Sequence, residues 1–524
     1  MSTIEESISK KVVRNTIFNA IGRFWSILVA LFLTPYIIGH IGIERYGIWA
    51  IVGVLTGYFG LLDFGIGASF VKYISEFYAK KDYGKINQVV NTGFVFYSIL
   101  AIFIIAVAFL FVHSLLAFFK IPDYLYNETV FVFLLGIMIF GVSNALSPFQ
   151  AIQGGLQRMD ITNKVSIAIS VPMILGTVFF LEKGYGLPGL MVNSAIILSI
   201  SNIINIIIAF KILPELKFNP FVFSRTMFKK QFDFGYKLQI ARISSMISVH
   251  IDKLLIAYFL SVGLVTFYQL GSSVIEHVKS ISLLLVTAIL PAFSEINAKG
   301  ERKKLIDGYI RGTKYLSLVA VPLFIFIIIS APQIMMVWLG EGYEKSVWII
   351  QILGIGWFCA VLSAVRTVVV QAIDKPVIEM NAGLVAVILN IPLSILFISL
   401  FGFVGVALGT SIALFFSATY GFVKLHQEFQ LSGRHFIKTT ILKTTAICVF
   451  IGVTLLGLTN ALQGVLSGSS RIAALTLFLI QAILFFGFYL TVLFYTKPFD
   501  NTDLMLLLKD RPLLIQRLMT GFSK

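Results

Sequence analysis

The chain has 524 residues, of which 58% are hydrophobic and only 13% are charged. A water-soluble protein of this length needs more polar surface, so the composition excludes an ordinary soluble globular protein. The formal net charge of +16 could suggest nucleic-acid binding. The distribution of that charge, described below, indicates membrane topology instead, so we expect no nucleic-acid partner.

Long apolar runs predict an all-α, polytopic membrane protein with about 14 transmembrane helices. Residues 17–38 and 316–337 are typical runs, and a helix that crosses the bilayer needs roughly 20 apolar residues. The short alternating segments of a membrane β-barrel do not occur. We predict no cofactor and no metal, because the sequence contains neither a nucleotide-binding P-loop nor a paired-cysteine or HExxH metal motif.

The spans divide the chain into six predicted regions. In chain order these are residues 1–14, a cytoplasmic N-terminal tail; 15–212, an N-terminal lobe of six spans; 213–236, a cytoplasmic linker between lobes with a short amphipathic helix; 237–425, a second lobe of spans seven to twelve; 426–497, spans thirteen and fourteen with the cytoplasmic loop before them; and 498–524, a cytoplasmic or interfacial tail.

The basic residues fix the predicted orientation. Of the 41 Lys and Arg residues, 32 lie in the N-terminal tail, in the loops that follow even-numbered spans, or at the adjoining span ends, and only five lie in the loops that follow odd-numbered spans. Cytoplasmic loops are enriched in Lys and Arg. We therefore expect both termini in the cytoplasm and basic loops that contact anionic membrane lipids.

The two halves of the chain resemble each other at a nearly constant offset. Arg23 and Arg242 are 219 residues apart, and the Ser-Glu pairs that begin at Ser75 and Ser294 have the same separation. Because each unit would hold six spans, both copies start on the cytoplasmic side and form a parallel repeat. This predicts two parallel six-helix lobes around a central cavity, plus two extra C-terminal helices.

Several segments resemble the polysaccharide and O-antigen flippases of the multidrug/oligosaccharidyl-lipid/polysaccharide (MOP) exporter superfamily. The residues that carry the resemblance are Leu62-Asp63-Phe64-Gly65-Ile66-Gly67 with Lys72 and Glu76, Ile251-Asp252-Lys253-Leu254-Leu255-Ile256, Trp338-Leu339-Gly340 with Tyr343, and Phe401-Gly402-Phe403-Val404-Gly405. It covers nearly the whole chain up to the twelfth span. Asp374-Lys375-Pro376 departs from the family, in which Gly often stands first.

The resemblance implies a function and partners. A flippase of this type moves undecaprenyl-diphosphate-linked oligosaccharide from the cytoplasmic to the outer leaflet of the inner membrane by alternating access and ion-coupled antiport. It implies a central cavity lined by spans one, two, seven and eight, a coupling ion (H⁺ or Na⁺), and a polysaccharide polymerase and a glycosyltransferase as candidate protein partners.

Four cations lie within predicted spans and are candidate substrate ligands: Arg23, Arg242, Lys253 and Lys279. A lipid-linked pyrophosphate needs cations to replace its water as it crosses the membrane. Arg23 and Arg242 could receive the headgroup, or they could snorkel to the cytoplasmic interface. A charge within a membrane helix costs several kcal/mol, which makes such residues functional candidates by default.

Three acids in the same helices are candidate ion-coupling residues: Asp63, Asp252 and Glu276. Asp252 and Lys253 could pair with Glu276 and Lys279 across spans seven and eight, as a structural cluster or as a gate that opens when an acid binds an ion. Asp63 could pair with Arg23, and the nearby glycines predict that span two bends.

Two other function classes compete with the flippase. One is a multidrug or small-cation antiporter of the same superfamily, in which twelve spans and fewer cavity cations are usual. The other is a membrane polysaccharide polymerase or glycosyltransferase, which usually carries a large outer or catalytic loop. The short predicted outer loops favour a transporter over an enzyme.

Overall fold

The computed structural model describes the chain outside residues 1–7, 288–292, 294–295, 298, 464–469 and 497–524. Every secondary-structure element in the described part is helical. The described residues form two compact units, one within residues 8–269 and 398–406 and the other from the described residues of 270–397 and 407–496. In this division α7 belongs to the first unit, whereas the lobe boundary at residue 237 stays a prediction.

The first unit contains the helices from α1 to α7. Their bounds are α1 (Ile8–Phe59), the short 3-10 helix η1 (Gly60–Asp63), α2 (Ile66–Ala79), α3 (Tyr83–Phe118), α4 (Asp123–Gly155), α5 (Met159–Glu182), α6 (Gly186–Ile212) and α7 (Arg225–Phe259), followed by α8 (Val262–Thr287), which begins in this unit and continues in the second.

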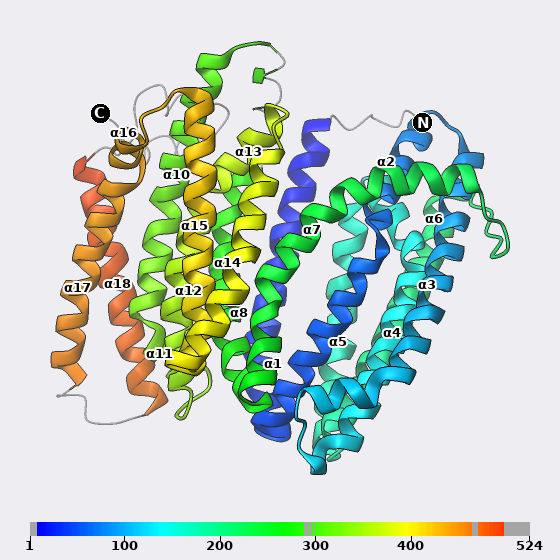
Figure 1. Cartoon of the computed structure of the whole chain (residues 1–524), viewed down its shortest axis with the longest axis horizontal. Coiled ribbons are helices and arrows are strands. Elements are labelled where there is room, and N and C mark those ends of the chain that lie inside the picture. The colour runs from blue at the N-terminus through cyan, green and yellow to red at the C-terminus, as the bar shows by residue number, and fades with distance from the viewer. Residues whose placement is uncertain (1–7, 288–292, 294–295, 298, 464–469, 497–524) are drawn as a thin grey trace. The chain divides into compact units, whose positions relative to one another are not determined.

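The second unit contains most of the remaining helices (Figure 1). Their bounds are α10 (Arg302–Ile329), α11 (Ala331–Trp338), α12 (Glu344–Leu362), α13 (Ala364–Ala372), α14 (Val377–Phe401), α15 (Phe403–Phe429), α16 (Gly433–Ile437), the π-helical turn η2 (Lys438–Leu442), α17 (Lys443–Gln463) and α18 (Arg471–Thr496). The last four residues of α14 and the first four of α15 belong to the first unit.

Eleven helical segments in the described residues are long and apolar enough to cross a membrane. One of them, Phe24–Asp63, has 40 residues, about 60 Å of helix and twice the thickness of a bilayer core. Gly42 interrupts it with φ 80° and ψ 171°, and in Figure 1 the blue ribbon of α1 turns back at its lower end. This agrees with the separate first and second spans of the prediction. Predicted spans seven and eight correspond to α7 and α8, which are not among the eleven, so the count of 14 stays a prediction.

The surface of these helices is apolar, as a lipid-facing surface must be. Phe32, Leu110 and Phe450 each expose about three quarters of their side chains. Polar side chains instead meet between helices: Gln153 on α4 donates to Asn205 on α6 at 2.8 Å, and Thr162 on α5 donates to Gln153 at 2.9 Å. In lipid, polar and small residues hold neighbouring helices together. The chain is therefore a multi-pass membrane protein.

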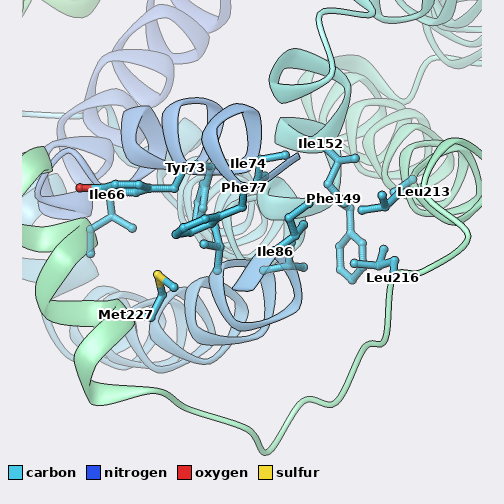
Figure 2. Close-up of a cluster of buried hydrophobic side chains, with 14 of the residues drawn as sticks. Ile66, Tyr73, Ile74, Phe77, Ile86, Phe149, Ile152, Leu213, Leu216 and Met227 are labelled. Atoms are coloured by element: carbon cyan, nitrogen blue, oxygen red, sulfur yellow. The ribbon is translucent and has the colours of Figure 1, made fainter. Parts of the chain in front are cut away.

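A buried aromatic and aliphatic cluster joins α2 to α3, α4 and the start of α7 (Figure 2). Ile66, Tyr73 and Phe77 extend from α2 toward Ile86 on α3, with Met227 of α7 on the same cluster. Leu213 and Leu216, from the segment between α6 and α7, close the cluster at another edge. This packing places the first turns of α7 against the N-terminal helices.

The segment between α6 and α7 is bound along α3 by asparagine side chains. Asn87 accepts from the backbone N–H of Lys217 at 2.9 Å and donates to the carbonyl of Glu215 at 3.2 Å. Asn91, one turn further on, accepts from Asn219 at 3.1 Å and donates to Lys217 at 3.2 Å. The amphipathic helix predicted within this segment is the beginning of α7 itself, which runs from Arg225 without a break.

We call Asn87 and Asn91, with the backbone of residues 215–219 that they bind, the asparagine clasp. Replacing Asn91 tests it. Asn91→Ala removes two hydrogen bonds from a side chain that is only 4% exposed, so we expect the free energy of unfolding to fall by about 1–3 kcal/mol. Gln88→Ala, at an exposed position on the same helix, is the control and should leave it nearly unchanged. Thermal unfolding of the purified protein in detergent measures both, and equal stability of the two variants would contradict the clasp.

Candidate functional site: a broken helix and buried ion pairs

The second predicted span is broken at the residues of its signature sequence. After η1, Phe64 and Gly65 adopt left-handed backbone conformations with φ 51° and 73°, and α2 then begins at Ile66. The Asp63 carboxylate accepts a hydrogen bond from the Gly65 N–H at 2.5 Å, which holds this turn. Glycine suits the left-handed position because it has no Cβ. The expectation that this span bends is therefore confirmed, and the bend is a complete interruption of the helix.

The backbone of helix α7 packs directly against the backbone of this break. A Cβ added to Gly65 would lie 2.1 Å from the carbonyl oxygen of Gly235, and one added to Gly235 would lie 2.6 Å from the carbonyl carbon of Gly65. Beside this crossing, the Gln239 side-chain amide donates to the carbonyl of Leu61 at 2.6 Å. An interrupted helix at membrane depth needs such partners for its freed backbone groups. The two glycines thus permit the close approach of the backbones, and Gln239 satisfies a carbonyl group that the break frees.

Asp63 lies beside polar groups from two other helices. Its Oδ2 is 3.5 Å from the hydroxyl of Tyr97 on α3. Asp63 and Tyr97 line a cavity of about 10 Å³ together with Gly60 and Asn144, the latter from α4. Pairing of Asp63 with Arg23 stays a prediction, because the side chain of Arg23 lies outside the described residues. The same holds for the side chain of Arg242.

Asp252 and Lys253 are both buried in α7. Asp252 is 1% exposed and Lys253 is 8% exposed. The Tyr268 hydroxyl, from α8, donates to Asp252 Oδ2. Charges at such burial are retained in membrane helices only with polar partners, and they mark functional positions more often than surface charges do. The structure therefore shows that both charged side chains are buried, and their role as ligands stays a prediction.

Glu276 and Lys279 form an ion pair along one face of α8. Lys279 Nζ lies 2.7 Å from Glu276 Oε1, and it also lies 3.9 Å from the ring centroid of Trp357 on α12. The spacing of three residues places the two side chains on one helix face. The aromatic face stabilises the ammonium group by a cation–π interaction. Pairing of this set with Asp252 and Lys253 stays a prediction.

One buried cation was assigned differently from the sequence. Arg366 is one of the 32 basic residues that the charge count above assigns to the cytoplasmic side, where such residues indicate only topology. In the structure it is 3% exposed and donates from Nη2 to Glu379 Oε2 at 2.9 Å. Its Nε and Nη1 have no hydrogen-bond partner among the described residues. The sequence signal was available, because mostly apolar residues continue for about one helical turn after Arg366, as far as Val370.

The arrangement is that of an integral membrane protein whose spanning helices are interrupted and charged at a few buried positions. Two solved structures share the fold. "Lipid II flippase MurJ, inward closed conformation" aligns with a TM-score of 0.68 and 16% identity over 90% of this chain and 97% of that one. "Inward-facing conformation of a multidrug resistance MATE family transporter of the MOP superfamily" aligns with a TM-score of 0.61 and 14% identity over 79% and 94%. The chain therefore shares the fold of these two solved structures.

The sequence comparison is more specific. Residues 12–297 match the model of the family described as "Polysaccharide biosynthesis protein", more than half of the chain, and the protein belongs to this family. It is 23% identical over 375 residues to a protein of Shigella flexneri named "Putative O-antigen transporter", covering 70% of this chain and 85% of that one. The resemblance inferred from the signature segments is confirmed.

Proposed function

We propose that this protein is a flippase that moves a polyprenyl-diphosphate-linked oligosaccharide, the repeat unit of a surface polysaccharide, from the cytoplasmic to the outer leaflet. Membership of the polysaccharide biosynthesis family supports this substrate class. The observation that carries the proposal is the burial of Lys253. A buried ammonium group can replace the water of a diphosphate, whereas a neutral or cationic drug gains nothing from it.

The proposal gives the charged residues two roles. Arg23, Arg242, Lys253 and Lys279 bind the diphosphate and the adjoining sugar during alternating access between two six-helix lobes. Asp63, Asp252 and Glu276 take up the coupling ion, H⁺ or Na⁺. A substrate diphosphate that binds Lys279 would displace Glu276 and release its carboxylate for the ion. Substrate binding and ion uptake would then be linked by this one exchange of ion-pair partners. The protein acts in the inner membrane with both termini in the cytoplasm.

Complementation tests the substrate. In a strain that lacks its polysaccharide flippase, the protein should restore surface polymer. Lys253→Gln and Lys279→Gln should each reduce it by roughly tenfold to a hundredfold, because each removes a charge-assisted hydrogen bond of about 1.5–3 kcal/mol. Lys120→Gln, an exposed lysine that follows α3, is the matched control and should behave as the parent.

Three outcomes separate the alternatives, provided that immunoblots show equal membrane levels of all variants. Restored polymer with normal Lys253→Gln and Lys279→Gln would keep the function and reject these ligands. Resistance to cationic drugs without restored polymer would favour a multidrug antiporter. Polymer chains that lengthen without restored translocation of the repeat unit would indicate a polymerase.

A further inference from the structure

We propose that the break in the second span is a binding site for one dehydrated monovalent cation, with Na⁺ the best fit, held by Asp63, Tyr97 and Asn144. This rests on the proposed function, for which it names the ion and the site that couple to transport. The three residues come from η1, α3 and α4, so three helical elements meet at the site.

The size of the cavity selects its occupant. A cavity of about 10 Å³ has room for about one water molecule or one small ion. The seven lining residues other than Asp63, Tyr97 and Asn144 carry no polar side chain, so a cation would enter without its hydration shell. A diphosphate or a sugar is too large. The cavity therefore suits an ion and not a portion of the substrate.

The donors are those that a hard monovalent cation prefers. Asp63 supplies a negative carboxylate, Tyr97 a hydroxyl oxygen and Asn144 an amide group whose nitrogen already donates to the carbonyl of Phe140 at 3.2 Å. Because the nitrogen is the donor in this hydrogen bond, the amide oxygen is the atom of Asn144 that would serve as an ion ligand.

The spacing between Asp63 and Tyr97 also fits a shared ion. Their oxygens are 3.5 Å apart, longer than the usual O–H···O hydrogen bond of about 2.5–3.0 Å. Two oxygens that each lie about 2.4 Å from one hard cation, a distance typical of oxygen ligands, are about 3.4 Å apart when they meet it at a right angle. The Gly65 N–H fixes the other oxygen of Asp63, so the carboxylate is already oriented.

Thermal unfolding of the full-length protein in detergent tests the site. We compare NaCl, KCl and choline chloride at equal ionic strength and constant pH. Saturable binding to the folded state should raise the unfolding temperature by a few degrees in NaCl, with less effect in KCl and none in choline chloride. Asp63→Asn and Asn144→Leu should abolish the sodium effect, and Tyr97→Phe should shift it to higher concentrations.

Glu428→Gln is the matched control, because it removes an acid on α15 that pairs with Lys375 and belongs to neither the proposed site nor the proposed coupling residues, so it should keep the sodium effect. If Asp63→Asn does not fold, Asn144→Leu and Tyr97→Phe still decide the outcome. The proposal is overturned if NaCl and choline chloride give equal unfolding temperatures, if the sodium effect survives Asn144→Leu, or if only pH moves the transition. Normal complementation without a sodium effect would reject the sodium site but support the flippase function. A sodium effect without complementation would support the sodium site but reject the flippase function.

Discussion

Gly65→Ala should nearly eliminate surface polymer and strongly destabilise the protein. The added methyl group would lie 2.1 Å from the carbonyl oxygen of Gly235, and the backbone at Gly65 has φ +73°. The left-handed conformation costs an alanine about 1–2 kcal/mol, and the overlap typically costs a further 1–3 kcal/mol. Because both partners are backbone, no side-chain rotation can relieve the contact.

Gly53→Ala is the control for this prediction. A Cβ at Gly53, in α1, has no neighbour within 4 Å, so the change should be neutral or slightly stabilising by helix propensity. Gly235→Ala should resemble Gly65→Ala, and the double variant should lose less than the sum of the two, since both changes break one contact. Unfolding in detergent and complementation measure these effects. A stable, active Gly65→Ala protein would show that α7 does not cross α2 at this point.

Glu379→Leu should produce the second large loss. It would leave the charge of Arg366, 3% exposed, without the carboxylate that now lies 2.9 Å away. Breaking a buried ion pair by removing one partner costs about 3–5 kcal/mol, and the exposure of Glu379, whose side chain is 36% accessible, places the expected loss at the lower end of that range. The unfolding temperature and the amount of protein in the membrane should both fall.

A double variant distinguishes charge from packing. Arg366→Met with Glu379→Leu removes both charges and should regain most of the lost stability, because apolar replacements of buried pairs are often neutral. Glu428→Gln, which alters the more exposed pair of Glu428 and Lys375, should have little effect. If the double variant is as unstable as Glu379→Leu alone, the loss comes from packing and not from the uncompensated arginine.

Gly421 gives an independent check on the same arginine. A Cβ at this position would lie 1.1 Å from Arg366 Nη1, so the guanidinium group packs directly on the backbone of α15. Gly421→Ala must displace a buried charged group and should destabilise the protein in the same assay. Gly487→Ala, in α18 with nothing within 4 Å of the added methyl group, is the corresponding control.

The sequence predicted the helical segments well because they follow from local composition. Apolar runs set the spans, and the spacing of Glu276 and Lys279 sets their shared helix face. The glycines around Asp63 predicted a bend, but they could not reveal that Gly235, which is 170 residues away, fills the space beside it. Contacts between distant segments depend on how the helices pack, and no local pattern encodes that.

The burial of Arg366 escaped prediction for a different reason. An arginine near a span end can extend its long side chain to the interface, and the sequence cannot distinguish this from an arginine that turns inward. The outcome depends on Gly421 and Glu379, which leave space and supply charge from two other helices. Tyr97 and Asn144 were missed because neutral polar residues in spans are common and carry no charge signal.

The asparagine clasp on α3 has a consequence for protein engineering. The stretch from Glu215 to Asn219 is hydrogen-bonded to two side chains that lie one helical turn apart. Its length is therefore fixed by the helix, and it is not a flexible linker. Reporter tags or fluorescent domains inserted there would shift the whole register and unfasten the first turns of α7. An insertion after Tyr185, in the short turn between α5 and α6, would leave the asparagine clasp untouched.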